Sequence, residues 1–266
     1  MYKTFSVIFS IALLSTILIS CGKRTEQAAT DSTSNVGIIP VPQRAYPDVS
    51  LSIVSPKEGE TLKNAGDSVK IVMQVSGTEL GTHTDGDSTM GIAYSKQGQH
   101  IHVIVDSKPY MADYKNGESF NIGVLTPGMH TIRAFPSFSW HESMKSLHAF
   151  ATRTFYIGNP ACDTSQMTNL NGPMLTYSRP KGTYATGENS KVLLDFYVSN
   201  AMLAPDQYKV KLWIDTTAMP DIVKWQPYYI TGLAKGDHTV KMQLVAPDGK
   251  AVPGTYNNPN GKITIE

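Results

Sequence analysis

The sequence predicts an all-β fold, and two observations carry this prediction. Apolar and polar residues alternate in short segments, among them 69–75, 101–105, 210–214 and 238–244. Alternation with a period of two is typical of half-buried strands, whereas helices show a period of 3.6 residues, which no segment after the N-terminal one sustains. We therefore expect antiparallel strands and no helix longer than about two turns.

The second observation is an internal repeat. The segment HIHVIVD (100–106) aligns with KVKLWID (209–215), and LTPGMHTI (125–132) aligns with LAKGDHTV (233–240). Each copy has roughly 100 residues and room for six or seven short strands, which favours a β-sandwich. The sequence thus predicts domain 1 over 48–158, an interdomain linker over 159–173, and domain 2 over 174–266. We also expect the two copies to fold separately.

Two motifs extend this prediction through a resemblance. SPKEGETL (55–62) resembles the opening of the immunoglobulin-like domains common in bacterial surface proteins, and LTPGMHTIRA (125–134) resembles their penultimate strand. The resemblance implies two tandem immunoglobulin-like antiparallel β-sandwich domains. It implies a fold and no chemistry.

The N-terminus predicts export. Lys3 is followed by about 15 mostly apolar residues, which fit a secretory signal peptide over 1–20 and are short for a helix that crosses a ~30 Å hydrocarbon core. The end of this segment, LISCG (18–22), resembles the lipobox of bacterial lipoproteins. That resemblance implies cleavage before Cys21, lipidation of Cys21 and anchoring in a membrane. Gly22 resembles the residue found in lipoproteins sent to the outer membrane, so we expect a cell-envelope location there.

The region between Cys21 and the first domain, 21–47, is predicted to be a flexible linker. Up to residue 35 it is polar and too poor in large apolar residues to fold by itself. Without residues 1–20 the chain has 22 basic and 22 acidic residues, which gives no reason to expect a nucleic-acid partner. The second cysteine, Cys162, has no partner for a disulfide within the chain if Cys21 carries lipid.

Differences between the copies indicate where function lies. Copy one has an insertion of 12 residues within 77–99, and its segment 136–148 replaces a short turn in copy two. In an immunoglobulin-like sandwich the two loops concerned lie at the same end, where such scaffolds commonly build binding sites. The candidate ligand surface there comprises Tyr94, Trp140, Glu142 and His148.

Histidines follow the same asymmetry, since six of the seven belong to copy one. His130 and His238 occupy equivalent inward positions and are predicted to be structural. His100 and His102 lie on one face of a strand, because residues two apart point the same way. With His141 as the third ligand, ahead of His148 or His83, they form a candidate Zn or Cu site. The alternative is a solvated strand face, because the aligned residues in copy two are Lys209 and Lys211.

These observations favour a non-catalytic envelope lipoprotein that binds or scaffolds through the loop end of domain 1. The expected partners are the membrane, through the lipid, and an envelope protein or glycan. Two alternatives remain open: a Zn- or Cu-binding protein that uses the His-x-His strand, and a carbohydrate-binding module that uses exposed aromatic side chains. An enzyme is not expected, because the Gly-x-Ser-x-Gly, His-Glu-x-x-His and phosphate-loop motifs do not occur.

Overall fold

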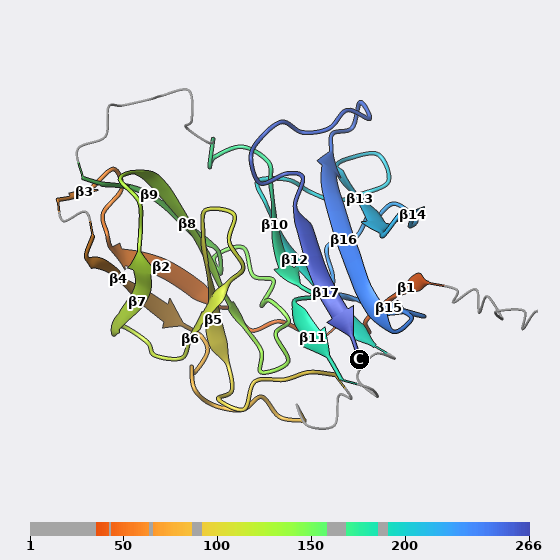
Figure 1. Cartoon of the computed structure of the whole chain (residues 1–266), viewed down its shortest axis with the longest axis horizontal. Helices are drawn as coiled ribbons and strands as arrows, with labels where there is room; N and C mark the ends of the chain where they lie inside the picture. Colours follow the sequence, from red (N-terminus) through yellow and green to blue (C-terminus); the bar gives the residue numbers. More distant parts are fainter. Residues whose placement is uncertain (1–35, 43, 64–65, 87–91, 159–168, 186–190) are drawn as a thin grey trace, which may run out of the picture. The chain divides into compact units, whose positions relative to one another are not determined.

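The first sandwich contains two sheets (Figure 1). One has the strand order β2 (Ser50–Ser55), β4 (Ser68–Ser76), β7 (Ser119–Val124). The other has the order β3 (Thr61–Leu62), β9 (Ala151–Ile157), β8 (Gly128–Ser137), β5 (His100–Val105), β6 (Met111–Asp113).

The second sandwich repeats this arrangement. One sheet has the order β1 (Gly37–Pro40), β15 (Tyr228–Thr231), β12 (Val192–Ser199), β10 (Met174–Arg179). The other has the order β11 (Gly182–Tyr184), β17 (Asn260–Ile265), β16 (Gly236–Val245), β13 (Lys209–Ile214), β14 (Thr217–Ala218).

These elements come from a computed structural model that describes residues 36–42, 44–63, 66–86, 92–158, 169–185 and 191–266. The described residues belong to one compact unit, Ser34–Glu266. Within them every regular element is a strand, which confirms the all-β prediction. None of them forms a helix that could cross a membrane. The signal peptide, Cys21 and Cys162 lie outside the described residues.

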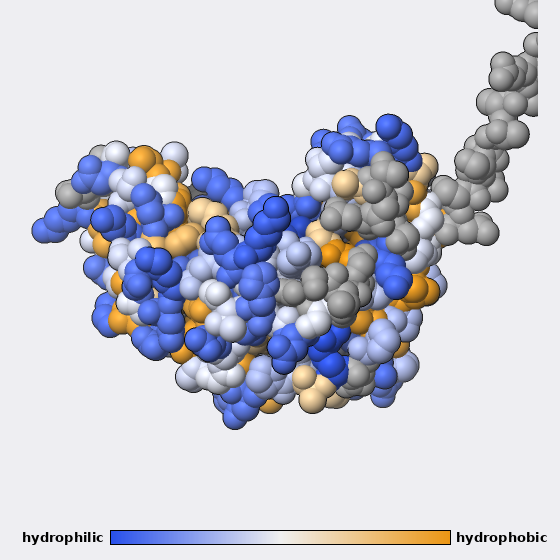
Figure 2. Space-filling model, turned by 90° about the horizontal axis from the view of Figure 1, so that it is seen from below, coloured by the Kyte–Doolittle hydropathy of each residue, from blue (hydrophilic) through white to orange (hydrophobic). Residues whose placement is uncertain are grey.

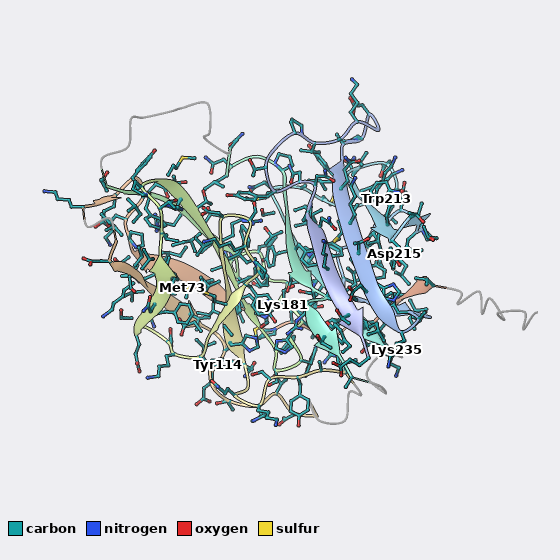
Figure 3. The ribbon with its side chains drawn as sticks, viewed as in Figure 1. Met73, Tyr114, Lys181, Trp213, Asp215 and Lys235 are labelled. Atoms are coloured by element: carbon teal, nitrogen blue, oxygen red, sulfur yellow. The ribbon has the colours of Figure 1, made fainter. Side chains whose placement is uncertain are left out.

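Apart from β1, the strands of the two copies correspond one to one, which confirms the tandem immunoglobulin-like architecture. In each copy a short strand pairs in parallel with the last strand, β3 with β9 and β11 with β17. The other strand pairs are antiparallel. Each sandwich has its own apolar core, and the two cores contain equivalent strand residues such as Met73 of β4, labelled in Figure 3, and Leu194 and Phe196 of β12.

The N-terminal strand β1 differs from the expectation. Residues 37–40 were predicted to belong to the flexible linker, yet they pair with β15 of the second sandwich, with Ile38 opposite Ile230. The pairing continues as Val41 N donates to Pro227 O at 3.1 Å. Ile38 also packs against the core of the second sandwich. A segment that precedes the first sandwich therefore completes a sheet of the second, which contradicts the prediction of two separate copies.

Buried contacts also join the two sandwiches. Ile104, Tyr110 and Phe135 of the first form one apolar cluster with Tyr197 of the second. Two residues before Tyr197 in the sequence, Asp195 forms an ion pair with the first sandwich. Its Oδ1 lies 2.6 Å from Lys145 Nζ, and the side chains of Lys145 and Asp195 are 2% and 0% exposed. Asp195 also accepts hydrogen bonds from Ser143 N and Ser143 Oγ, each at 3.1 Å. The charge on Asp195 is thus fully partnered across the junction, as a buried carboxylate requires.

Candidate metal centre

The candidate site is built on β5, a central strand of its sheet. Ile101, Val103 and Val105 point into the core of the first sandwich. His100 and His102 therefore lie on the opposite face, because successive side chains of a strand alternate. Both histidines are nevertheless 0% exposed. The alternative of a solvated strand face is wrong for this copy.

Aromatic side chains and the second sandwich cover these histidines. The Tyr110 ring stacks on His102 with 3.6 Å between centroids and 9° between planes. Tyr114, labelled in Figure 3, packs its ring 5.0 Å from that of His100. Ser178 Oγ of β10 lies 3.0 Å from His102 Nδ1. Packing of one sandwich on the other thus buries a face that would otherwise meet water.

His141 joins the pair from the loop between β8 and β9. Its backbone has φ 69, the left-handed region, in a tight turn where His141 N donates to Phe138 O at 2.9 Å. His141 Nδ1 lies 3.1 Å from His100 Nε2, and His100 Nε2 lies 3.0 Å from His102 Nε2. One ligand atom from each residue falls within 4.8 Å of the others. The three histidines predicted as ligands do converge, and we call them the histidine triad.

Hydrogen bonds orient the triad. His100 Nδ1 lies 2.8 Å from Gly98 O. A carbonyl oxygen can only accept, so Nδ1 carries the proton and the lone pair of Nε2 points into the triad. Gly98 has φ 84, and a Cβ there would lie 2.5 Å from backbone atoms of Thr82. Such second partners fix the tautomer of histidines that bind metals.

The triad is uncharged at neutral pH. Burial lowers the pKa of His100 to about 4 and lowers the pKa values of His102 and His141 as well. The positive charges of Arg179 and Lys181 act in the same direction on all three. Neutral imidazole is the form that binds a metal. The three residues thus offer nitrogen lone pairs in a protected position.

The candidate ligand surface is only partly exposed. Trp140 and Glu142 are 2% and 0% exposed, so they are not available to a ligand on the surface, and that prediction is wrong for them. Trp140 Nε1 donates to Glu142 Oε2 at 2.8 Å, and Tyr46 Oη donates to Glu142 Oε1 at 2.7 Å. Arg44 Nε lies 3.7 Å from the same carboxylate. The Trp140 and Glu142 side chains are packed inside the protein, because the loop that carries them folds back on the sandwich.

The remaining candidates lie on the surface. Tyr94 is 40% exposed, and His148 is exposed as well. His83 is exposed, with its Nε2 3.0 Å from Lys96 O, and it is not part of the triad. The expected convergence of the two loops is confirmed, because Ser95 N donates to Ser139 O at 2.7 Å.

His130 and His238 have the structural role predicted for them. His130 Nδ1 lies 2.9 Å from Asp106 Oδ2, and its Nε2 lies 2.8 Å from Thr126 O. His238 makes the same two contacts, with Asp215 and Ala234, each at 2.8 Å. Both rings face acceptors on both sides, which suits the protonated form. These two histidines close a turn in each copy.

Sequence reasoning missed several groups around the triad. Gly98 and Ser178 both contact it, and neither was a candidate. Tyr110 also contacts it, although it was considered only as an aromatic platform for a glycan. Ser178 comes from the other sandwich, so no spacing in the sequence could have pointed to it. Tyr110 follows β5 after a turn, and its stacking on His102 depends on how that turn folds.

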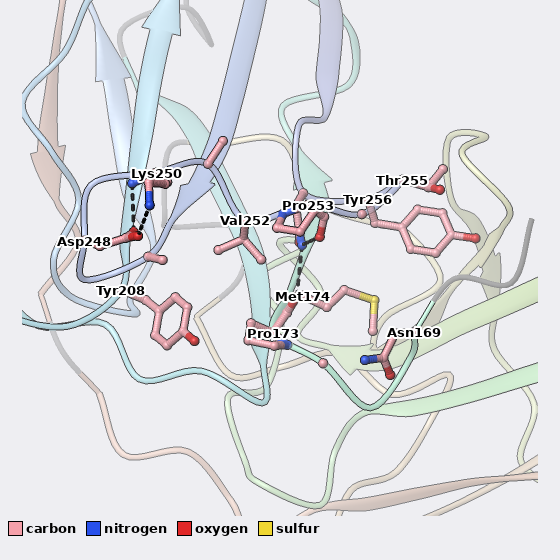
Figure 4. A pocket seen from close by; sticks show the side chains of 15 residues that line it. Asn169, Pro173, Met174, Tyr208, Asp248, Lys250, Val252, Pro253, Thr255 and Tyr256 are labelled. Carbon is pink, nitrogen blue, oxygen red and sulfur yellow. Dashed lines mark hydrogen bonds and ion pairs between the residues drawn. The ribbon is translucent and has the colours of Figure 1, made fainter. Parts of the chain in front are cut away.

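A hollow away from the triad lies in the second sandwich (Figure 4). It has a volume of about 730 Å³, and three of its polar side chains make contacts within the protein. Lys250 Nζ lies 3.1 Å from Asp248 Oδ2, and Asn257 Nδ2 donates to Pro173 O and Pro253 O, each at 3.0 Å. These groups hold the local loops together, so we do not place a binding site there.

Among the described residues, large exposed hydrophobic side chains are scattered. On the face seen in Figure 2, hydrophilic residues predominate and hydrophobic ones occur in small groups. The large hydrophobic residues that are exposed come from different parts of both sandwiches: Ile39, Val54, Tyr94, Val124, Leu147 and Met202. Isolated exposed residues of this kind are normal on protein surfaces.

Comparisons with known proteins give only distant structural similarities. No family model and no curated protein matches the chain. Among solved structures it is similar to fibronectin(III)-like modules of Clostridium thermocellum CbhA, at 13% identity and TM-score 0.28, over 81% of this chain and 94% of that one. It is also similar to Bacteroides ovatus SGBP-B of the mixed-linkage glucan utilization locus, solved with a heptasaccharide, at 12% identity and TM-score 0.24, over 81% of this chain and 47% of that one.

A third similar structure is the neural ectodermal development factor IMP-L2, at 12% identity and TM-score 0.24, over 82% of this chain and 94% of that one. These similarities are too distant to transfer a ligand or an activity to this chain.

Proposed function

We propose that this protein is a non-catalytic, lipid-anchored protein of the cell envelope that binds one copper or zinc ion at His100, His102 and His141. The observation that carries the proposal is the convergence of three ligand nitrogens within 4.8 Å. Three histidines can bind either metal and leave a position for a further ligand. Tyr110 Oη lies 3.3 Å from His141 Nδ1, and we propose this phenol for that position.

The charges near the triad favour copper in its monovalent state. Arg179 and Lys181 are close enough to lower the pKa values of all three histidines. The triad itself contains no carboxylate. By Coulomb's law a monovalent ion meets half the repulsion of a divalent ion at the same place. Zinc is therefore the weaker candidate, and copper(I) is the ion to test first.

The anchoring part of the proposal rests on the lipobox-like segment LISCG and Cys21. Incorporation of labelled fatty acid in cells is its direct test. Replacing Cys21 with Ala should abolish the label and release the protein from the membrane fraction. A wild-type protein that takes up no label, or that salt alone releases from membranes, would contradict the anchor and leave the metal proposal unaffected.

Metal binding is tested with purified protein that begins at residue 22. Copper(I) should bind at one equivalent in competition with a chromophoric copper(I) chelator, and zinc should bind more weakly by calorimetry. The double variant His100→Ala with His102→Ala should lose the site. The double variant His83→Ala with His148→Ala removes two exposed histidines outside the triad and should bind as the wild type does.

The pH dependence of binding separates this site from surface histidines. Burial holds the pKa of His100 at about 4, so protons should compete with the metal only in the acidic range well below the ordinary histidine pKa of ~6.5. Adventitious binding by exposed histidines should instead fade near that value. Equal binding by both double variants, or loss of binding near pH 6.5, would refute the proposal.

A further inference from the structure

A second site, with different residues, lies where the two sandwiches meet. A pocket of about 420 Å³ is lined by residues of β5, β8 and the β5–β6 turn from the first sandwich. The end of β10 and the loop before β17 supply its walls from the second sandwich. This volume falls in the range of pockets that hold small molecules, and such pockets are common at domain junctions.

The pocket is strongly basic. The described residues of its lining include no acidic residue. They include four cationic ones: Lys108, Arg133, Lys181 and Lys262. Lys108 and Lys262 are exposed at the rim, and Lys181, labelled in Figure 3, is half-buried. Lys181 Nζ donates to Tyr110 O at 2.7 Å, which holds its charge beside the pocket. The chain as a whole is nearly neutral, so this concentration of positive charge is local.

Arg133 is the most informative of the four. It is 4% exposed, and no described carboxylate lies within ion-pair distance of its guanidinium. Its Nη1 donates to Thr176 Oγ1 at 3.1 Å and its Nη2 to Asp106 O at 2.8 Å, whereas its Nε has no hydrogen-bond partner. A buried cation without an anion is costly, and a buried donor without an acceptor adds to that cost. An anionic ligand in the pocket would relieve both.

The walls of the pocket indicate which other chemical groups its ligand should have. Tyr110, Tyr177 and Tyr256 line it, and the Arg133 guanidinium lies over the Tyr256 ring at 3.6 Å from its centroid. Exposed amides from Asn258 and Asn260 offer hydrogen-bond donors and acceptors. Aromatic faces suit the apolar face of a ring, amides suit hydroxyl groups, and arginine suits a carboxylate or sulfate.

We infer that this pocket binds an acidic saccharide, with the sugar ring beside Tyr177 and Tyr256 and its carboxylate or sulfate near Arg133, Lys108 and Lys262. The inference goes beyond the proposed metal site and does not depend on it. Tyr110 and Ser178 line the pocket and also contact the histidine triad, so the two sites share a wall.

The probes are three oligosaccharides of equal length: oligogalacturonate, sulfated galacto-oligosaccharide and neutral galacto-oligosaccharide. Calorimetry with the metal-free protein from residue 22 should show binding of at least one acidic probe and about tenfold weaker binding of the neutral one. The comparison of the two acidic probes shows whether carboxylate or sulfate is preferred. Inorganic sulfate alone should bind more weakly than either, because it lacks the ring.

Three variants locate the binding. Lys108→Gln with Lys262→Gln changes only exposed rim residues and should weaken the acidic probe about tenfold. Lys70→Gln with Lys235→Gln makes the same change of charge at exposed positions outside the pocket and should have no effect beyond nonspecific screening. Arg133→Gln should abolish binding, with circular dichroism and thermal unfolding as checks on its fold.

Four outcomes would overturn the inference. The first three are no binding of either acidic oligosaccharide, equal binding of acidic and neutral probes, and equal loss in the pocket and control variants. Binding of inorganic sulfate as strong as that of the sugars would reduce the site to one for simple anions and would refute the saccharide. None of these outcomes bears on copper binding, which is measured without sugar.

Discussion

Strands β5 and β13 occupy the same place in the two copies and meet different surroundings. β13 alternates between buried and half-exposed residues, as a sheet with one solvated face should. Every residue of β5 is buried, because Tyr110 and Ser178 cover the face that carries His100 and His102. The comparison teaches that the scaffold fixes which way a side chain points, whereas docking of the other sandwich decides whether it meets water.

The largest expected effect comes from exchanging these two strand faces. His100→Lys with His102→Lys would place two ammonium groups in a fully buried space beside Arg179 and Lys181, and should destabilise the protein by about 4–6 kcal/mol. The reverse exchange, Lys209→His with Lys211→His, alters half-exposed positions and should change stability by less than about 0.5 kcal/mol. Urea unfolding measures both. Similar effects in the two copies would mean that β5 is not covered in solution.

The ion pair at the junction should have the next largest effect. Lys145→Met leaves Asp195 as a buried carboxylate without its cation, which should cost about 3–5 kcal/mol in the free energy of unfolding. Arg153→Met removes a pair with Glu58 whose carboxylate is 61% exposed, and should cost about 1 kcal/mol or less. The same denaturant experiment compares them. If Lys145→Met were as mild as Arg153→Met, the two sandwiches would not be packed as described.

Removal of β1 should weaken one copy more than the other. A chain that begins at Val41 lacks the strand that pairs with β15 and loses the packing of the half-buried Ile38, worth about 1–2 kcal/mol. Hydrogen exchange should rise in β15 and stay unchanged in β7, which holds the equivalent place in the first sandwich and pairs there with β4 alone. Unchanged exchange in β15 would show that residues 37–40 are a linker after all.

The smallest effect should come from the two histidine–aspartate pairs. Hydrogen bonding to Asp106 raises the pKa of His130. Burial lowers the pKa of His238, but the hydrogen bonds to Asp215 and Ala234, together with the nearby negative charges, raise it overall. Burial opposes but does not cancel the same bonds, which lower the pKa values of both aspartates. Lys108 opposes the shift of His130, and Asp237 reinforces that of His238.

The sign of the pH dependence follows from these directions. The histidine contribution is full below the unfolded pKa of ~6.5 and is lost as pH rises through the higher folded value. The aspartate contribution is full above its unfolded value and is lost as pH falls through the lower folded one. Each pair should therefore stabilise the folded protein most near pH 5–6. The difference in unfolding free energy between the wild type and His238→Ala should become smaller as pH rises above neutrality. A difference that is constant with pH would contradict the ionic pairing.

The sequence by itself determined the strands, the repeat and part of the candidate site. Alternation of apolar residues in Ser68–Ser76 has a local cause, since one face of the strand meets its own core. The pairing of His100 with His102 follows from the same geometry, and His141 was found because the loop after β8 is longer than its counterpart. These features depend on contacts within one copy, which a repeated scaffold makes predictable.

The tertiary structure alone decided what happens where the copies meet. Burial of Glu142, covering of β5 by Ser178 and placement of Arg133 against Tyr256 all join segments far apart in the chain. The insertion of residues 37–40 beside β15 is of the same kind, since a short segment of GIIP carries no mark of the sheet that it joins. Spacing and periodicity report on neighbours along the chain, whereas packing between two finished sandwiches depends on the shapes and charges of whole surfaces.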